Sequence, residues 1–251
     1  MPLWNLKKKF LEKKKHKYVD GTIDLKITGD DYGRNKEASE GIRQAYKKGY
    51  ISHTSIMVDK IDKKPLENLP EGLSYGLHFN LLDFDRVEFA SGEVPSSISN
   101  SSFASNKTFL YLSKEQKEVV RNEIIYQINK YKEFGYKCIY FDSHGHTHNK
   151  LPIAKIIIPI LKEEGFTHAR IPMNIKHDHL LFDLLYKSRV TRLYRRNFIT
   201  TDYFCSCYDY IHIKNLNKYK GKTIEIMTHP YINKELGLVN RRDIDFEYLN
   251  K

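Results

Sequence analysis

The sequence predicts an α/β fold, namely a (β/α) barrel-like single domain that is either a regular TIM-type barrel or a distorted or incomplete one. The 251 residues exceed the commonest domain length but suit one α/β barrel. Segments rich in β-branched residues alternate with amphipathic helical segments, as in parallel sheets with crossover helices. A barrel is favoured over an open sheet because no glycine-rich phosphate turn follows the first strand.

The first half of the chain supplies three predicted strands and one helix. The strand Thr22 to Thr28 is rich in β-branched residues and stops at a glycine and two acids. The helix over residues 35–50 places Ala38, Ile42 and Ala45 on one face. The next two strands are predicted over residues 51–58 and 73–82.

A long irregular stretch, residues 83–112, separates the third strand from the next helix. Because it is too long for a passive connection, we expect a lid or a substrate-binding insertion there. The following helix, within residues 113–137, has Ser113 as N-cap and Gln116 at the capping-box position. The later predicted elements are a strand at 137–146, a helix at 152–166, a short strand at 168–172 and a strand at 222–230, with 176–219 less regular.

The charge is strongly basic, with 42 Lys and Arg against 31 Asp and Glu, and much of the excess lies near the N-terminus. We treat residues 1–18 as a basic leader and residues 19–251 as the single barrel domain. Lysines alternate with apolar residues in the leader, so residues 1–17 either rest on an anionic membrane surface or form a solvated tail. Because lysines interrupt its apolar stretches, we expect the leader not to be a secretory signal peptide and the protein to be cytoplasmic, with membrane-peripheral binding as the alternative.

Polar residues capable of chemistry follow the predicted strands at their carboxyl ends, where barrel enzymes place their active sites. Taken singly, each has an ordinary structural reading, a hydrogen-bonding histidine or a helix-capping acid, but their joint placement points to one site. They are Asp30, Asp31, His78, Asp142, His144, His146, Arg170 and His229.

Two imidazoles and one carboxylate form a common ligand set for a catalytic divalent metal, and Asp31, His78 and His144 make such a set. Hydrolysis by metal-bound water then needs a base, for which Asp30 is suited, and an acid, for which His229 is suited. Because Asp30 and Asp31 are adjacent, this division requires the strand to break at Gly29 and Asp30.

Two further expectations concern the neighbours of these ligands. In an extended segment His144, His146 and His148 would share a face, and at least one of them lies outside the first metal shell. Asp142 is placed to orient an imidazole through its second nitrogen. The CxC pair, Cys205 and Cys207, is interpreted as structural.

Five motifs resemble those of the YdjC-like carbohydrate deacetylases, which include the chitooligosaccharide deacetylases and are distant relatives of the polysaccharide deacetylases. The motifs are TGDDYG at 28–33, GLHFNL at 76–81, DSHGHTH at 142–148, RIP at 170–172 and HP at 229–230. Their order and span, Leu25 to Tyr231, make the resemblance specific, although residues 83–112 do not align and the leader is extra.

The resemblance implies a (β/α) barrel-like fold and removal of an N-acetyl group from an amino sugar or oligosaccharide. It further implies one divalent metal ion, zinc or magnesium, at the positions of Asp31, His78 and His144. Asp30 is then the base, Arg170 its charge partner and His229 the acid.

Two other functions remain open at this stage. A metal-dependent phosphoesterase or amidohydrolase barrel also uses an HxH motif, but there it usually follows the first strand, where this chain has two aspartates. A nucleic-acid-binding protein would explain the positive charge, yet no recognition motif accompanies it and no nucleic-acid partner is expected.

Overall fold

The computed structural model describes residues 23–59, 68–82, 88–89, 92–93, 102–104, 106–175 and 181–240. The basic leader and most of residues 83–101 lie outside this part, so the expectations for them, including the domain boundaries and the lid, stay predictions. Within the described part, no helix combines the length and the apolar character that crossing a bilayer requires.

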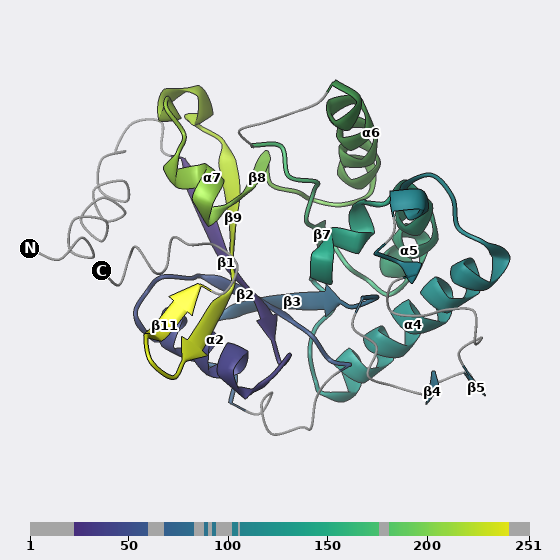
Figure 1. The fold of residues 1–251 in the computed structure, drawn as a ribbon, viewed down its shortest axis with the longest axis horizontal. Helices are drawn as coiled ribbons and strands as arrows, with labels where there is room; N and C mark the ends of the chain where they lie inside the picture. Colours follow the sequence, from purple (N-terminus) through teal and green to yellow (C-terminus); the bar gives the residue numbers. More distant parts are fainter. Residues whose placement is uncertain are drawn as a thin grey trace, which may run out of the picture.

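The centre of the fold is a parallel sheet that curls into a half-barrel (Figure 1). Its seven strands are, in spatial order, β7 (His168–Ala169), β6 (Tyr140–Ser143), β3 (Ser74–Phe79), β2 (His53–Ile56), β1 (Asp24–Tyr32), β9 (Thr223–Thr228) and β8 (Tyr203–Ser206). The predicted α/β barrel-like class is therefore confirmed in its incomplete form. Strand β8 was missed, because the region around it has no clear periodicity.

The two edge strands of this sheet, β7 and β8, do not form a ladder with each other. Ile199 bridges the edge of β7, since the Ala169 amide donates to its carbonyl at 3.1 Å. The amide of Asn174 donates to the carbonyl of Phe204 in β8 at 3.1 Å. We call the gap between β7 and β8, together with these two hydrogen bonds, the seam.

Helices follow the strands as the crossover pattern requires. They are α2 (Lys36–Lys47), α4 (Lys114–Glu133), α5 (Leu151–Glu163), α6 (Leu181–Asn197) and the short α7 (Cys207–Ile211), with 3-10 turns η2 (Asn106–Phe109), η3 (His144–Asn149) and η4 (Leu216–Tyr219). The α4, α5 and α6 helices pack in succession along one side of the sheet (Figure 1). The capping box of Ser113 and Gln116 at the start of α4 is confirmed.

The other side of the fold carries α2 and a hairpin of β10 (Pro230–Asn233) and β11 (Gly237–Asn240), which the sequence did not predict. Gly41 allows α2 to lie directly on this hairpin, because a Cβ there would come within 2.5 Å of the Tyr231 nitrogen. A two-stranded piece of β4 (Glu88–Phe89) and β5 (Gly92–Glu93) completes the described elements.

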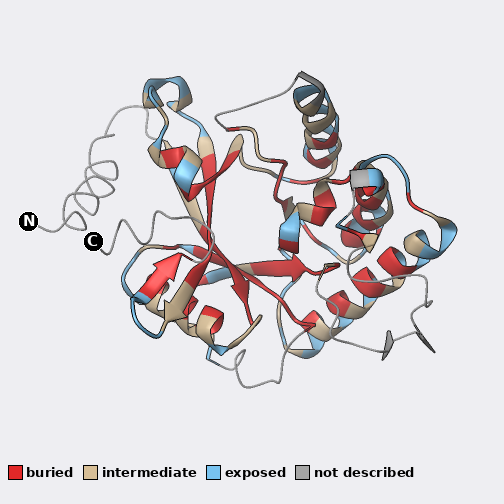
Figure 2. Ribbon diagram, viewed as in Figure 1, coloured by how far each residue is buried: buried red, intermediate tan, exposed pale blue. Residues whose placement is uncertain are grey.

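The hydrophobic core lies between the sheet and its helices, so that the strands are buried along most of their length (Figure 2). A smaller apolar cluster lies under α7 and includes Cys205 and Cys207. No disulfide joins the three cysteines, all of which are described, and the structural role of the CxC pair stays a prediction. Burial of apolar side chains thus fixes the strands whose carboxyl ends carry the polar residues described next.

Candidate active site

The adjacent aspartates both reach the site because the end of β1 is irregular. Gly29 pairs with Thr54 of β2 and Tyr32 with Ile56, so the register slips between them. Within this bulge Asp31 has a φ of 74°. Positive φ is uncommon outside glycine and, in an aspartate, points to a functional constraint. The expected break is therefore confirmed, although the strand continues to Tyr32.

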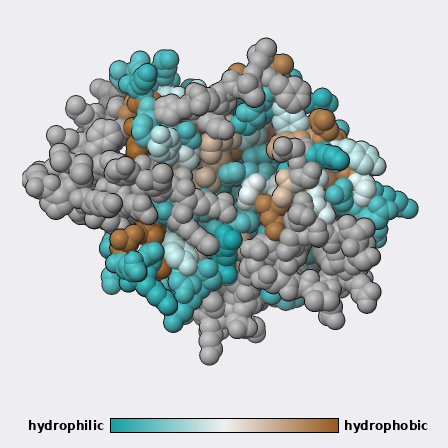
Figure 3. Space-filling model, viewed as in Figure 1, coloured by the Kyte–Doolittle hydropathy of each residue, from teal (hydrophilic) through white to brown (hydrophobic). Residues whose placement is uncertain are grey.

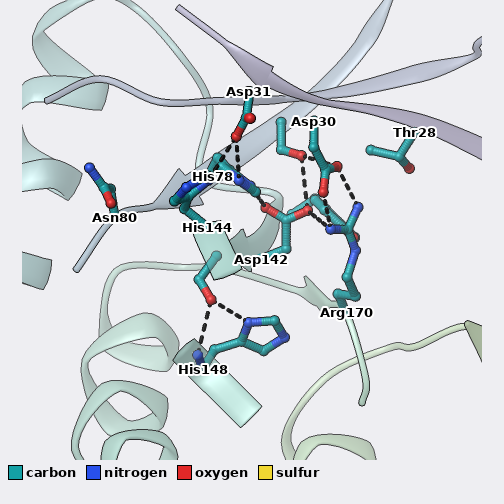
Figure 4. Close-up of polar contacts among 12 residues, drawn as sticks. Thr28, Asp30, Asp31, His78, Asn80, Asp142, His144, His148 and Arg170 are labelled. Atoms are coloured by element: carbon teal, nitrogen blue, oxygen red, sulfur yellow. Dashed lines mark hydrogen bonds and ion pairs between the residues drawn. The ribbon is translucent and has the colours of Figure 1, made fainter. Parts of the chain in front are cut away.

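The three predicted metal ligands lie together (Figure 4). Asp31 Oδ1 is 2.8 Å from His144 Nδ1 and 3.3 Å from His78 Nε2. One ligand atom from each residue lies within 4.8 Å of the others, and all three residues are buried. His78 Nε2 has no hydrogen-bond partner, since its approach to Asp31 lacks hydrogen-bond geometry. A buried nitrogen facing a carboxylate and a second imidazole fits a divalent metal ion.

Asp142 holds the other ring nitrogen of His78, as predicted. Its Oδ1 lies 2.6 Å from His78 Nδ1, which completes the carboxylate–histidine arrangement common behind metal ligands. Burial by itself would lower the pKa of His78, but the carboxylates of Asp142 and Asp31 raise it to about 10. The pocket around this imidazole therefore favours positive charge, whether a proton or a metal ion supplies it.

Arg170 binds three acids, namely Asp30, Asp142 and Glu225. Its Nη1 and Nη2 atoms bind the two oxygens of Asp30 at 2.6 and 2.8 Å, and Nη1 lies 2.8 Å from Asp142 Oδ2. Its Nε and Nη2 atoms bind Glu225 at 3.0 and 2.9 Å. Burial would raise the pKa of Asp30, but the charge and hydrogen bonds of Arg170 hold it well below its usual range. The predicted pairing of Arg170 with Asp30 is thus present.

A second group of possible metal ligands, Asp30, His78 and Asp142, also has one ligand atom from each residue within 4.8 Å of the others. Both of its carboxylates already bind the Arg170 guanidinium, which is fully buried. A metal ion there would have to lie beside this fixed positive charge. The electrostatics therefore favour the group of Asp31, His78 and His144.

Two residues of the charged cluster, Glu225 and Ser55, were not predicted from the sequence. Glu225 on β9 also accepts hydrogen bonds from Thr28 at 3.0 Å and Tyr140 at 2.6 Å. The Ser55 hydroxyl lies 3.0 Å from Asp30 Oδ1 and 2.9 Å from Asp142 Oδ2, so it bridges the two acids. A signal for Glu225 existed, because a lone acid inside the apolar strand TIEIMT is rarely buried without a partner.

The DSHGHTH segment departs from the expected extended conformation. Strand β6 ends at Ser143, and residues 144–149 form η3, in which Gly145 and His146 have φ values of 57° and 56°. The expectation that His144, His146 and His148 share one strand face was therefore wrong. The positive φ of Gly145 favours glycine in this turn, and a Cβ there would also displace the tip of the Leu82 side chain.

Because of this turn, His144 alone of the three joins the metal group. His148 Nδ1 lies 2.6 Å from the Ser143 hydroxyl, and its ring packs against Tyr194. The ring of His146 packs on Phe204, with 5.6 Å between centroids. The expectation that His146 or His148 lies outside the ligand set agrees with this geometry.

His229 directly follows β9, at the end of the sheet where Asp30 lies. Gly29 is paired with Thr228, so Asp30 and His229 each follow a paired residue of adjacent strands. The charge of His229 is one of the smaller causes that lower the pKa of Asp30. The His229 amide donates to Asn240 Oδ1 at 2.9 Å, which ties this strand end to the hairpin.

Several known proteins that resemble this chain carry the name carbohydrate deacetylase. A carbohydrate deacetylase of Oceanobacillus iheyensis is 24% identical over 213 residues, covering 82% of this chain and 84% of that protein. Carbohydrate deacetylases of Danio rerio and Vibrio cholerae are 26% and 28% identical, over 60% and 55% of this chain. In those two matches the chain spans about half the length of the relative, 50% and 54%.

A solved structure from Enterococcus faecalis V583, described as a candidate cellobiose-phosphate cleavage protein, has a similar fold. Its TM-score is 0.59 at 18% sequence identity, with 85% of this chain and 83% of that chain covered. The family model described as YdjC-like protein matches residues 24–251, which include every site residue discussed above. The chain therefore belongs to the YdjC-like protein family.

Proposed function

We propose that this chain is a metal-dependent carbohydrate deacetylase that hydrolyses the N-acetyl group of an amino sugar, either free or within a larger glycan. The observation that carries the proposal is the buried group of Asp31, His78 and His144 beside an aspartate clamped by Arg170. The relatives named carbohydrate deacetylases supply the reaction class.

The metal would be held by Asp31 through Oδ1, His78 through Nε2 and His144 through Nδ1, the atoms that face one another. When bound, a divalent ion supplies Lewis acidity, which polarises an amide carbonyl and makes water more acidic. Two nitrogen ligands favour zinc, whereas magnesium prefers oxygen ligands, and the proposal includes both ions.

Amide hydrolysis also requires a base for the attacking water and an acid for the departing nitrogen. We assign the base to Asp30 and the acid to His229, which follow paired residues of adjacent strands. Arg170 keeps Asp30 ionised, and together with Ser55 it fixes both carboxylate oxygens. Because a carboxylate with a low pKa is a weak base, this fixed position is as important as its basicity.

The test combines product formation with metal analysis. The full chain is purified, stripped of metal, and reloaded with zinc or magnesium, and acetate release is measured across a panel of N-acetylated sugars. We expect acetate and free amine in equal amounts and about one bound metal ion per chain. A panel of sugar phosphates is assayed in parallel, so that release of phosphate without acetate would replace this proposal with a phosphoesterase.

Two histidine variants locate the metal. His144→Ala should lose the bound ion and the acetate release, because it removes one of three ligands. His212→Ala removes an exposed histidine whose Nδ1 contacts the Tyr208 carbonyl at the end of α7, and it should change neither quantity. Full metal content and full activity in His144→Ala would refute the ligand assignment.

A further inference from the structure

An exposed apolar patch lies at the end of η2, on the two residues that follow it, and on the start of α6. Phe109, Leu110 and Tyr111 are 37, 74 and 68% exposed, and Leu184 and Leu185 are 44 and 66% exposed. Single exposed apolar residues are ordinary in soluble proteins, but three in succession beside two more are not. We call these five residues the apolar patch.

The two parts of the apolar patch are joined through Tyr186. The rings of Phe109 and Tyr186 are in edge contact, with 5.5 Å between centroids. The Tyr186 hydroxyl donates to the Phe109 carbonyl at 2.7 Å, which fixes the segment against α6. Tyr186 therefore holds the segment of Phe109 next to the start of α6.

Helix α6 continues this surface with positive charge. It contains five basic residues and one acid, and that acid, Asp183, is paired with Lys187 at 2.7 Å. Residues Leu185, Arg189, Arg192 and Arg196 are all exposed and follow helical spacing, so they form a stripe along one face. Hydrophobic and hydrophilic residues accordingly border each other on the side of the molecule that carries α6 (Figure 3).

The start of α4, which lies beside Tyr111, carries charges of both signs, whereas basic residues predominate on α6. Lys117 lies over the ring of Tyr111, 5.7 Å from its centroid, and Lys114 is exposed nearby in sequence. Glu115 and Glu118 are exposed on the same turns and offset these lysines. The excess of positive charge beside the apolar patch therefore comes from α6.

The apolar patch borders the catalytic side of the half-barrel. Strand β6 runs into η3, which carries His144, and then into the first turn of α5. The Leu151 amide at that turn donates to the Tyr186 hydroxyl at 2.7 Å. The Lys150 ammonium contacts Phe103 and Thr108 and so anchors the segment that leads to the patch. Helices that follow parallel strands begin on the catalytic side, which places the start of α6 there as well.

We propose that the apolar patch and the arginine stripe of α6 together dock this protein on an anionic phospholipid membrane, with the catalytic side toward the bilayer surface. Leucine and aromatic side chains enter the headgroup region, while arginines contact lipid phosphates. The net charge of +11 attracts the whole chain to such a surface.

A membrane explains the surface better than a protein partner does. A stable protein interface usually buries about 800 Å² on each side, with arginines and aromatic residues at its centre. Here the apolar side chains lie at one end and the arginines extend away from them along one helix face. A flat anionic surface can contact the apolar patch and the arginine stripe at the same time. A protein partner would need apolar and arginine side chains together at the centre of its interface, and here they are separate. This inference concerns binding alone and does not rest on the proposed deacetylase activity.

The test uses the full chain and vesicles of phosphatidylcholine alone or mixed with phosphatidylglycerol, in co-sedimentation at low and high salt. We expect binding to the anionic vesicles that weakens with salt. Leu110→Asp with Leu185→Asp, and separately Arg189→Glu with Arg192→Glu, should weaken it. Each basic residue near an anionic surface contributes roughly a fivefold factor, so the arginine variant should bind at least about twentyfold more weakly.

A matched control lies on the hairpin, where Lys234→Glu with Leu236→Asp changes an exposed lysine and a leucine that is 52% exposed. This control should bind like the unaltered chain, and circular dichroism checks that all variants are folded. Equal binding by the patch variants and the control would overturn the proposal, because the vesicles would then be held elsewhere, for example by residues 1–17. Absence of binding to anionic vesicles at low salt, or a patch variant that changes only the oligomeric mass in light scattering, would also overturn it.

Discussion

Replacing Arg170 by methionine tests whether the charged cluster holds the site together. The change roughly keeps the length of the side chain and removes the positive charge that Asp30, Asp142 and Glu225 share. All four residues are almost entirely buried. The carboxylates would therefore lose their common partner without gaining access to water.

The expected loss of stability is large. Removing one partner of a buried ion pair costs roughly 3–5 kcal/mol, and here one guanidinium serves three acids, so the upper end of that range applies. Typical domains have unfolding free energies of about 5–15 kcal/mol, so the variant should retain a measurable folded state. Adding Asp30→Asn to Arg170→Met removes the carboxylate that has lost both guanidinium hydrogen bonds and should recover about 1–3 kcal/mol, whereas Glu225 keeps Lys26 at 3.7 Å in either variant.

The difference in unfolding free energy between the unaltered chain and Arg170→Met should depend on pH. In the unaltered chain the pKa values of Asp30 and Glu225 are lowered, so the stability that they contribute is present above about pH 4 and is lost as the pH falls through their folded values. Without Arg170, burial raises the pKa of Asp30, and the folded variant takes up a proton there as the pH falls, whereas Lys26 still lowers the pKa of Glu225. Each proton taken up reduces the difference in stability by about 1.4 kcal/mol per pH unit.

Urea unfolding followed by circular dichroism at pH 7 and pH 5, with a chelator in every sample, measures both quantities. We expect a difference of about 4–5 kcal/mol at pH 7 that shrinks by roughly 2 kcal/mol at pH 5. Arg121→Met, an exposed change on α4, should stay within about 0.5 kcal/mol of the unaltered chain. A difference below about 1 kcal/mol, or one that does not depend on pH, would refute the reasoning.

Three further outcomes are expected. Asp142→Asn should weaken metal affinity by about 10- to 100-fold in a chelator competition, because His78 loses the carboxylate that orients it; unchanged affinity would contradict that role. Asp30→Asn should lower the rate of acetate release by roughly 10²-fold or more with the metal retained, and His229→Ala should flatten the basic limb of the pH profile. Loss of metal from Asp30→Asn at an unchanged intrinsic rate would show that the two aspartates have the opposite roles. Gly145→Ala should lower the unfolding free energy by about 1–3 kcal/mol in urea titrations, because the residue has a φ of 57°, and an unchanged value would mean that η3 adapts.

The sequence was sufficient for the fold class and for the expectation that the proposed metal ligands lie together. Parallel strands bring their carboxyl ends to one side, so polar residues placed after successive strands were expected to meet, and Asp31, His78 and His144 do. The strand limits were less accurate. Strand β6 was extended to His146 because the alternating histidines resemble a strand pattern, whereas Gly145 turns the chain after Ser143.

Other features depend on contacts between distant segments, which no local pattern contains. Ser55 looks like an ordinary strand residue, and its position between Asp30 and Asp142 follows from the strand order alone. Strand β8 lies in a basic and aromatic region whose helix and strand signals compete, and it forms because β9 offers an edge. The hairpin β10–β11 was missed because its turn, NKELG, lacks the usual two-residue signal.

The seam between β7 and β8 has a consequence for how this molecule opens. A gap closed by a few amide bonds is the line along which a sheet separates at least cost, and amide hydrogen exchange reports such local opening. Arg170 directly follows β7, while its acidic partners lie on β1, β6 and β9, so its ion pairs draw that edge of the half-barrel inward. The exchange rates of the Ala169 and Ile199 amides therefore report on charges buried inside the half-barrel. Neutralising those charges should speed exchange along the seam before it affects the central strands.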